Sequence, residues 1–236
     1  MKIALLGYGR MGKAIEKFAL DRGHQITFIQ DKDKYSGEIK GADIAINFSI
    51  PEAAVDNIKL AFDHDVPVVC GTTGWLNQYK EIVAYCQKRK SGFLYASNFS
   101  IGVNLFFKIN SYVAGLMKAH QKDYTPSIEE IHHIHKIDAP SGTALTLAEG
   151  VLKESNLTGW ELEGTATDKL SIKSVREGEV PGTHRVAYLS EIDEISIKHQ
   201  AFGREGFALG AVIAAEWLAG KKGIFSMDDV LNFHST

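Results

Sequence analysis

Short apolar runs alternate with longer stretches of amphipathic, helical spacing along the first hundred residues. The helical stretches lie at residues 13–19, 51–64 and 77–89, and the apolar runs, which predict strands, lie at residues 2–6, 25–30, 43–48, 67–70 and 92–96. Strands that alternate with helices are typical of an α/β fold with a parallel sheet and right-handed crossovers. The segment 31–43 is short for a full crossover helix, so we expect a trimmed second unit there.

The pattern changes near residue 101. It predicts a helix over 104–118, a strand over 127–135 and a helix over 141–155, followed by strands rich in turn residues through 197. This is typical of a separate α+β domain with a mixed sheet. The stretches 207–218 and 227–233 are again helical. We therefore expect a Rossmann-like dinucleotide-binding domain over 1–103, a second domain over 104–206, and a segment 207–236 that packs back on the first.

A glycine motif follows the first predicted strand and opens the first predicted helix. In this context Gly7 permits a tight turn, Gly9 lets the backbone approach a pyrophosphate, and Gly12 lets the helix pack closely on the strand. Asp31 ends the second predicted strand, at the distance where an acid meets the adenosine ribose. The neighbouring Lys32 favours the extra phosphate of NADP, so the choice between NADH and NADPH stays open. Arg10 is either a phosphate contact or a solvated surface residue.

Small polar loops follow three further predicted strands, at residues 47–49, 71–74 and 97–100. The carboxyl ends of parallel strands meet at one edge of a sheet, and ligands bind there. We expect these loops to hold the nicotinamide and its ribose, although each loop alone could be ordinary turn chemistry.

The most informative segment of the second domain is residues 128–144, which gathers histidines, a lysine and a helix start. His132 and Lys136 are four residues apart, so they share a face whether the segment is extended or helical, and His133 and His135 face the other way in a strand. Pro140 is expected at or near the first position of the helix that follows.

The start of that helix predicts an anion site. Free amides at Gly142 and Thr143, with Lys136 nearby, favour a carboxylate or phosphate. His132 is the expected proton donor or acceptor, because an imidazole titrates near neutral pH.

Two other interpretations of this segment were weighed. The histidines could be polar residues on a half-exposed strand, or His133, His135 and Asp138 could ligate a metal. Lys136 between them disfavours a cation, and Cys70 and Cys86 lack metal-ligand spacing. We expect no metal.

Composition narrows the class of protein. The chain has 236 residues, a net charge of -3 and a pI near 6.3, which argues against a dedicated nucleic-acid or membrane-surface protein. No apolar run reaches membrane-spanning length, and the first strand leaves no room for a signal peptide. Two distant cysteines fit a reducing compartment, so we expect a cytoplasmic protein.

The chain resembles the bacterial dihydrodipicolinate reductase family, also called 4-hydroxy-tetrahydrodipicolinate reductase, of the diaminopimelate route to lysine. The resemblance spans nearly the full length and is strongest in the segment Glu130–Ala144, which reads Glu-x-His-His-x-x-x-Lys-x-Asp-x-Pro-Ser-Gly-Thr-Ala. Other matching segments are the glycine turn, 71–74, 97–104, 176–178, 181–184 and 199–208. The chain departs from the family in its short first domain and in Asn47, where the family often has aspartate.

The resemblance implies an enzyme that reduces 4-hydroxy-tetrahydrodipicolinate with NADH or NADPH, losing water and giving tetrahydrodipicolinate. It implies that His132 is the catalytic acid or base, that Lys136 is a catalytic or orienting cation, and that the substrate carboxylates are held by His133, Gly142 and Thr143. His133 could contact substrate only through a twist or bulge in the strand. The implied cofactor-binding residues are Gly7, Tyr8, Gly9, Arg10, Met11, Gly12, Asp31, Lys32, Gly71, Thr72, Thr73, Ala96, Ser97, Asn98 and Phe99.

The family is usually tetrameric through sheets of its second domain, so the resemblance implies a homotetramer. It also implies that the domains close during the reaction to exclude water. Two rival classes are a different Rossmann dehydrogenase of amino-acid metabolism and a non-catalytic nicotinamide-binding regulator. The first would lack the segment 130–144, and the second would need neither His132 nor Lys136 and would carry a basic recognition helix, which the sequence lacks.

Overall fold

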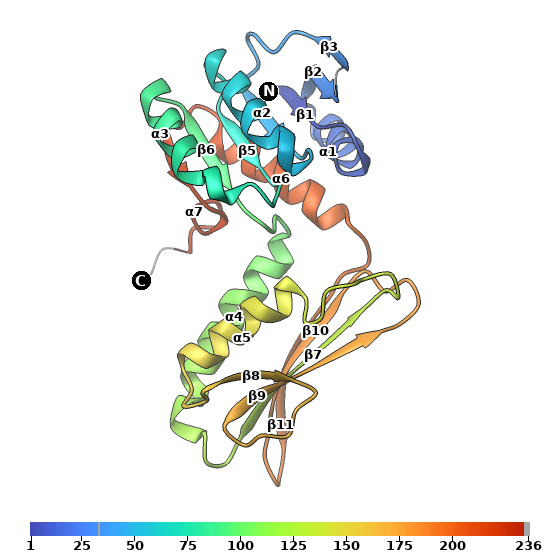
Figure 1. Cartoon of the computed structure of the whole chain (residues 1–236), viewed down its shortest axis with the longest axis vertical. Helices are drawn as coiled ribbons and strands as arrows, with labels where there is room; N and C mark the ends of the chain where they lie inside the picture. The colour runs from blue at the N-terminus through green and yellow to red at the C-terminus, as the bar shows by residue number, and fades with distance from the viewer. Residues whose placement is uncertain (33, 234–236) are drawn as a thin grey trace. The chain divides into compact units, whose positions relative to one another are not determined.

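The computed structural model describes residues 1–32 and 34–233, and the chain divides into two compact units. The first unit contains Met1–Ile101 together with the residues from Glu205 onward, and the second contains Gly102–Arg204. Figure 1 shows the elements of both units. The segment from Glu205 therefore returns to the unit in which the chain began.

The first unit is built on one twisted sheet with the strand order β12-β6-β5-β4-β1-β2-β3. Every neighbouring pair is parallel except β2 and β3, which are antiparallel. The strands β1, β4 and β5 are buried almost throughout, as expected for a sheet covered on both faces. The strands are β1 Lys2–Leu6, β2 Gln25–Asp31, β3 Lys34–Gly37, β4 Ile44–Asn47, β5 Val68–Cys70, β6 Gly92–Tyr95 and β12 Gly223–Phe225.

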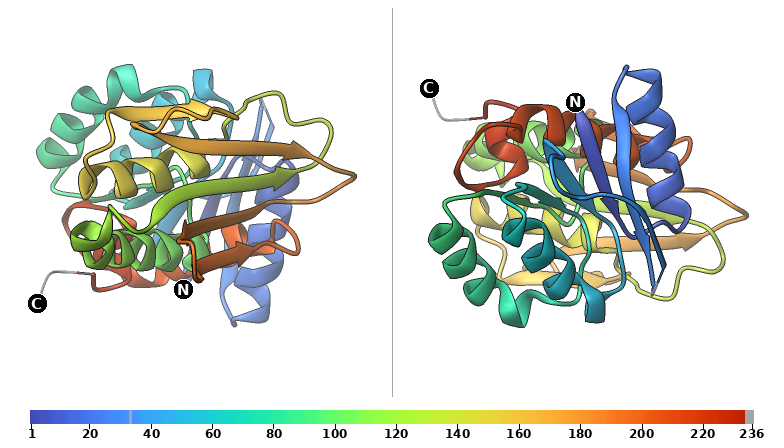
Figure 2. Two further views of the ribbon diagram at one scale, coloured as in Figure 1. Left: turned by 90° about the horizontal axis from the view of Figure 1, so that it is seen from below. Right: turned by 90° about the horizontal axis from the view of Figure 1, so that it is seen from above.

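Helices cover this sheet on both faces, and each face has its own apolar core. Ile58, Phe62 and Ile82 pack on one face, whereas Ile15 and Ala211 belong to the core of the other. Figure 2 shows α1 and α2 on opposite sides of the strands. The helices of this unit are α1 Arg10–Asp21, α2 Pro51–Asp63, the 3-10 turn η1 Leu76–Gln78, α3 Tyr79–Arg89, α6 Glu205–Leu218 and α7 Met227–Val230.

The trimmed part of the first unit is a hairpin. β3 turns back antiparallel to β2 where a crossover helix would otherwise run, and it is exposed along its length. The strand β12, which lies beside β6, was not predicted from the sequence. Its apolar part is only three residues long, too short to give a periodic signal.

The second unit has a mixed sheet with the order β11-β10-β7-β9-β8. β7 runs parallel to β9 and antiparallel to β10, so the prediction of a mixed sheet is confirmed. Two helices, α4 and α5, pack on one face around Phe106, Ile128, Leu147 and Val186. The elements are α4 Ile101–Met117, η2 Lys118–His120, β7 Thr125–His132, α5 Gly142–Lys153, β8 Gly159–Leu162, β9 Lys169–Arg176, β10 Thr183–Leu189 and β11 Glu194–Gln200.

The predicted bounds of β7 and α5 were wrong by a few residues. The strand predicted over 127–135 begins at Thr125 and ends at His132, because the backbone turns after His132 and the amide of Lys136 bonds the carbonyl of His133 at 3.1 Å. The helix predicted from Ser141 begins at Gly142. Ser141 is its N-cap, with Oγ accepting the amide of Ala144 at 3.2 Å, so Pro140 precedes the cap.

Candidate active site

The glycine turn after β1 has the form that a dinucleotide needs. Gly7 has a φ of +99°, and a methyl group on it would lie 2.3 Å from the carbonyl oxygen of Phe48. A methyl group on Gly12 would lie 2.3 Å from the carbonyl oxygen of Gly7, so the helix packs tightly on the turn. A methyl group on Gly9 would meet nothing within 4 Å, and Gly9 caps α1 without a side-chain hydrogen bond. The open space at the start of α1 therefore suits a pyrophosphate.

The loops after β4 and β5 are locked together at the same edge of the sheet. The amide of Gly71 bonds the carbonyl of Asn47 at 2.9 Å, and the amide of Ser49 bonds Oγ1 of Thr72 at 2.8 Å. A methyl group on Gly71 would lie 2.2 Å from the ring of Phe48, so glycine is required there. The backbone of these loops is consequently fixed before any ligand binds.

Two loop residues turn their side chains away from this edge. Asn47 is fully buried, and its Nδ2 donates to the carbonyl of Ala54 at 3.2 Å. The side-chain amide of Asn47 therefore anchors the loop to α2. Phe99 is 1% exposed, with its ring 5.5 Å from the ring of Phe48, so only its backbone is available to a ligand.

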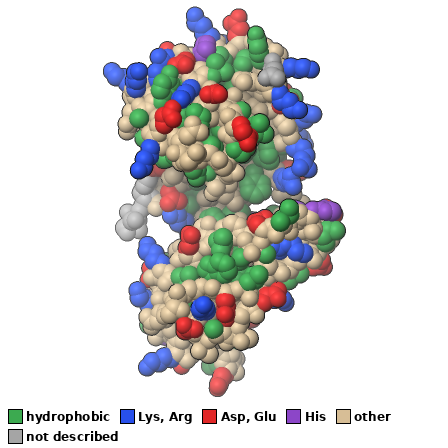
Figure 3. Space-filling model, viewed as in Figure 1, with side chains coloured by type: hydrophobic (Ala, Val, Ile, Leu, Met, Phe, Trp, Pro, Cys, Tyr) green, Lys and Arg blue, Asp and Glu red, His purple; other side chains and the backbone are tan. Residues whose placement is uncertain are grey.

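The end of β2 at this edge of the sheet is exposed. Asp31 is the last residue of β2, and Lys32 follows it with a φ of 54°. Lys and Arg side chains line the flank of the first unit formed by α1 and the β2–β3 hairpin, as Figure 3 shows. The exposed basic residues of these elements include Arg10, Lys13, Lys32 and Lys34.

Two side chains of the glycine turn, those of Tyr8 and Met11, have contacts within the unit. The hydroxyl of Tyr8 donates to the carboxylate of Glu16, which raises the pKa of Tyr8. Met11 packs against the apolar core beside α1. What these two residues offer to a ligand is chiefly backbone and ring surface.

The centre of the second unit is the buried carboxylate of Glu130 on β7. Sheet register places Ser174 of β9 on one side of Glu130 and His184 of β10 on the other, and cross-strand neighbours point to the same face. Glu130 is fully buried and accepts the amide of Ser141 at 3.0 and 3.1 Å, the hydroxyl of Ser174 at 2.7 Å, and Nη2 of Arg176 at 3.2 Å.

These donors keep Glu130 charged. Burial alone raises the pKa of a carboxyl group, but the contacts with His132, Ser141 and Ser174 outweigh burial and hold the pKa of Glu130 far below its ordinary value. The carboxylate is therefore a fixed negative charge beneath the histidines.

His132 lies against this carboxylate, two residues further along β7. It is 7% exposed, and its Nδ1 lies 3.3 Å from Oε2 of Glu130. A methyl group on Gly182 would lie 3.1 Å from the other ring nitrogen, Nε2. The absence of a side chain at Gly182 leaves room in front of Nε2.

A second buried histidine, His184, lies beside the first, with ring centroids 5.0 Å apart. Its Nε2 is 3.1 Å from Oγ of Ser141. Burial and the neighbouring His132 lower the pKa of His184 from 6.5 to about 4. His184 is therefore neutral near pH 7.

Lys136 lies in the loop after β7 rather than on a strand face. Its Nζ donates to both carboxylate oxygens of Asp138, at 2.8 and 2.9 Å, and this lowers the pKa of Asp138. Arg176 bonds the carbonyls of Lys136 at 3.3 Å and Asp138 at 2.6 Å, so the loop is tied to β9. We predicted that His132 and Lys136 share one face of a regular element. That reasoning was wrong, because β7 ends at His132 and Lys136 lies in the loop that follows.

The first residues of α5 present backbone N–H donors that a ligand can use. Ser141 caps the helix, while the amides of Gly142 and Thr143 have no partner among the described residues. A methyl group on Gly142 would meet nothing within 4 Å. Free amides in front of open space suit an anion.

His133 and His135 follow the end of β7. Their rings are 6.1 Å apart, and Nε2 of His135 is 3.4 Å from Oε1 of Glu179. Because His133 is outside the regular strand, the strand alternation that turned it away from His132 does not apply.

The structure does not group the residues that the sequence offered as metal ligands. Among the described residues, the three ligand atoms close enough to share an ion belong to Glu130, His132 and His184, not to His133, His135 and Asp138. The guanidinium of Arg176 already contacts Glu130 at 3.2 Å, and a positive charge so close disfavours a cation.

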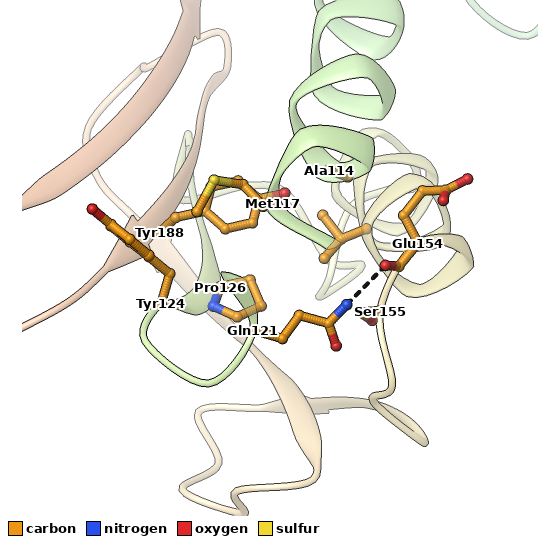
Figure 4. A pocket seen from close by; sticks show the side chains of 9 residues that line it. Ala114, Met117, Gln121, Tyr124, Pro126, Glu154, Ser155 and Tyr188 are labelled. Carbon is orange, nitrogen blue, oxygen red and sulfur yellow. Dashed lines mark hydrogen bonds between the residues drawn. The ribbon is translucent and has the colours of Figure 1, made fainter. Parts of the chain in front are cut away.

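Sequence reasoning gave no role to Glu130, Ser174, Arg176 or His184, although three of them stand in segments that carried the family resemblance. Ser174 has no local signal and is found only through its register with Glu130. A separate cavity beneath α4 and α5, shown in Figure 4, is bordered by Met117, Gln121 and Tyr188, and Gln121 donates to the carbonyl of Glu154 at 2.9 Å. Its volume of about 10 Å³ holds a water molecule at most, not a dicarboxylate.

The fold and these two regions define a two-domain, nicotinamide-dependent reductase. The family model of the dihydrodipicolinate reductase N-terminus matches residues 1–99, and that of the C-terminus matches residues 102–231. The chain belongs to the dihydrodipicolinate reductase family, so the predicted family is confirmed.

Relatives agree with this assignment along the full chain. The 4-hydroxy-tetrahydrodipicolinate reductase of Christiangramia forsetii is 52% identical over 98% of each chain, and that of Archaeoglobus fulgidus is 35% identical over 98% of this chain and 100% of its own. A dipicolinate-bound dihydrodipicolinate reductase from Paenisporosarcina sp. TG-14 shares the fold, with a TM-score of 0.79 and 20% identity over 96% and 97% of the two chains. The rival dehydrogenase and regulator classes are thereby set aside.

Proposed function

We propose that this chain reduces 4-hydroxy-tetrahydrodipicolinate to tetrahydrodipicolinate with NADH or NADPH, a step of the diaminopimelate route to lysine. The observation that carries the proposal is the segment Glu130–Ala144, which sets His132 on a buried carboxylate near a helix start with free amides. In the balanced reaction a hydride and a proton enter the substrate, and its 4-hydroxyl leaves as water.

The first unit is the cofactor-binding part of this proposal. The open space at Gly9 and the fixed loops after β4 and β5 fit a dinucleotide, whose reduced nicotinamide supplies the hydride when bound. The residues proposed to hold it are Gly7, Tyr8, Gly9, Arg10, Met11, Gly12, Asp31, Lys32, Gly71, Thr72, Thr73, Ala96, Ser97, Asn98 and Phe99.

The second unit binds and protonates the substrate. The amides of Gly142 and Thr143, with His133, neutralise the carboxylates, and Lys136 exchanges its contact with Asp138 for one with the substrate. The Paenisporosarcina relative is described as bound to dipicolinate, which supports a cyclic dicarboxylate as ligand.

His132 delivers the proton from Nε2, the nitrogen that Gly182 leaves accessible. His184 is held neutral by burial and takes no part in the exchange. The protein therefore supplies orientation, charge neutralisation and one proton.

The proposal also includes a homotetramer formed through the sheet of the second unit, in the cytoplasm. Within the described part of the chain, no helix of that unit packs on the sheet face opposite α4 and α5, where Glu129 and Lys173 form an ion pair at 3.1 Å. None of the described helices is long and apolar enough to cross a membrane. Sedimentation of the purified protein tests the assembly, and a monomer at micromolar concentration would contradict it.

The experiment that tests the reaction is the oxidation of NADH and of NADPH in the presence of enzymatically generated 4-hydroxy-tetrahydrodipicolinate. We expect substrate-dependent oxidation that is lost in His132→Gln and strongly reduced in Lys136→Ala. No oxidation with either nucleotide, despite nucleotide binding, would overturn the proposed reaction.

A further inference from the structure

His132, the proposed proton donor, lies against the carboxylate of Glu130, which has no role of its own in the proposed reaction. Glutamate is almost never fully buried unless its charge is paired, and Glu130 is fully buried. Its surroundings show what the buried charge does.

The two oxygens of Glu130 have different neighbours. Oε1 accepts the hydroxyl of Ser174 at 2.7 Å and Nη2 of Arg176 at 3.2 Å, both from β9. Oε2 faces the histidines, 3.3 Å from Nδ1 of His132 and 3.7 Å from Nε2 of His184. The amide of Ser141 bonds both oxygens. One oxygen thus anchors the carboxylate, and the other is directed at the imidazoles.

We propose that Glu130 is a positioning residue, whose Oε2 holds the Nδ1 proton of His132 so that the exchanged proton sits on Nε2. The inference rests on the proposed role of His132 as proton donor. Nδ1 of His132 is buried and has no other partner among the described residues, and it lies at ion-pair distance from Oε2 without the alignment of a full hydrogen bond. A small rotation of the ring completes the bond.

The remaining charged and titratable groups around the pair leave Glu130 as the charged neighbour of the His132 ring. His184 on β10 takes its hydrogen bond with Ser141 and is the more deeply buried of the two rings. Arg176 on β9 and Lys136 in the loop are positive, Asp138 is paired with Lys136, and His199 on β11 adds no hydrogen bond to Glu130. Glu130 is therefore the negative group in contact with His132.

The test compares Glu130→Gln with Glu149→Gln, at an exposed glutamate of α5 outside both the proposed site and the proposed subunit interface. Glutamine keeps the shape and an acceptor for Ser174 and Ser141 but removes the charge. We expect kcat to fall about 100-fold or more in Glu130→Gln, with little change in nucleotide affinity. Glu149→Gln should behave as the unmodified protein does.

An unchanged kcat in Glu130→Gln would overturn the inference, as would a rise in KM alone. If His132→Gln is inactive while Glu130→Gln is fully active, only the positioning role fails. If His132→Gln retains full turnover, the proposed function of His132 fails first. The double variant should lose no more activity than His132→Gln alone, because the two groups act as one unit.

A measurement on the unmodified protein covers the case in which Glu130→Gln does not fold. Nitrogen-15 NMR of labelled histidine, with the His132 signals assigned by their loss in His132→Gln, identifies the neutral tautomer. We expect a proton on Nδ1 and none on Nε2. The opposite tautomer would contradict the proposal whatever the variants do.

Discussion

The proposed cofactor edge of the first unit comprises the glycine turn after β1 and the loops after β4 and β5. This edge is built from backbone, whereas the site around Glu130 in the second unit is built from buried side chains. At the edge, Gly7, Gly9 and Gly71 contribute by having no side chain. Around Glu130, the side chains of Ser174 and Arg176 on β9 and the backbone amide of Ser141 converge on one carboxylate. Substitutions at the edge should therefore act by adding a side chain where there is none. Substitutions at the buried site should act by removing a charge or a hydrogen bond.

The largest expected effect comes from comparing two glycines of one turn. Gly7→Ala should destabilise the protein by about 1–3 kcal/mol or prevent folding, because Gly7 has a positive φ and its methyl group would strike Phe48. Gly9→Ala should fold normally and bind NADPH at least several-fold more weakly, since its methyl group enters open space. Thermal unfolding and nucleotide fluorescence measure the two effects. Equal stability of the two variants would contradict this account of the turn.

The next effect concerns the space in front of His132. Gly182→Ala places a methyl group 3.1 Å from Nε2, so we expect kcat to fall by up to about 100-fold through misplacement of the ring or the substrate. Gly182 also has a positive φ, of +156°, so the control for backbone strain is Gly178→Ala, at a φ of +47° where the methyl group meets nothing within 4 Å; it should keep its kcat. Gly142→Ala should raise KM for the substrate and leave stability unchanged, because its methyl group also meets nothing within 4 Å. A Gly182→Ala enzyme with normal kcat would show that Nε2 is not the reacting nitrogen.

The account of the buried site also predicts how stability depends on pH. The pKa of His184 is lowered in the folded protein from 6.5 to about 4, so the unfolded chain binds more protons between these values. The contribution of His184 to the free energy of unfolding is complete above pH 6.5 and falls by roughly 3 kcal/mol as the pH drops to 4. Urea unfolding between pH 4 and 7 measures this.

A control separates His184 from the other histidines. His184→Gln should flatten the pH dependence, whereas His120→Gln, at an exposed position, should leave it unchanged. An equally steep profile in His184→Gln would place the titrating group elsewhere.

The smallest effect concerns nucleotide choice at the exposed end of the cofactor edge. Lys32→Ala should weaken NADPH relative to NADH by only about two- to five-fold, because an exposed ion pair contributes little. The ratio of kcat/KM for the two nucleotides reports it. Lys17→Ala, an exposed lysine further along α1, serves as the control. An unchanged ratio in Lys32→Ala would leave Lys32 without a role in phosphate recognition.

The cofactor edge could be predicted from sequence because its signal is local. Gly7, Gly9 and Gly12 stand together, and the structure gives each the surroundings expected of it. Asn47 shows what the sequence leaves open: a polar residue after a strand can face either a ligand or a neighbouring helix, and only the fold shows that its amide is bonded to Ala54.

The buried site could be predicted only in part. The Glu130–Ala144 segment was recognised, but the contacts of Glu130 depend on the strand register that brings Ser174 and His184 beside it. Ser174 is 44 residues away in sequence and has no pattern of its own. The end of β7 was placed three residues late because apolar spacing does not mark where the backbone turns away from its neighbours.

The central claim is that cofactor binding and proton delivery belong to separate regions. It is tested most directly by measuring NADPH affinity and the single-turnover rate of substrate reduction in His132→Gln. We predict unchanged affinity and a single-turnover rate reduced by about 100-fold or more. An unchanged single-turnover rate would contradict the claim.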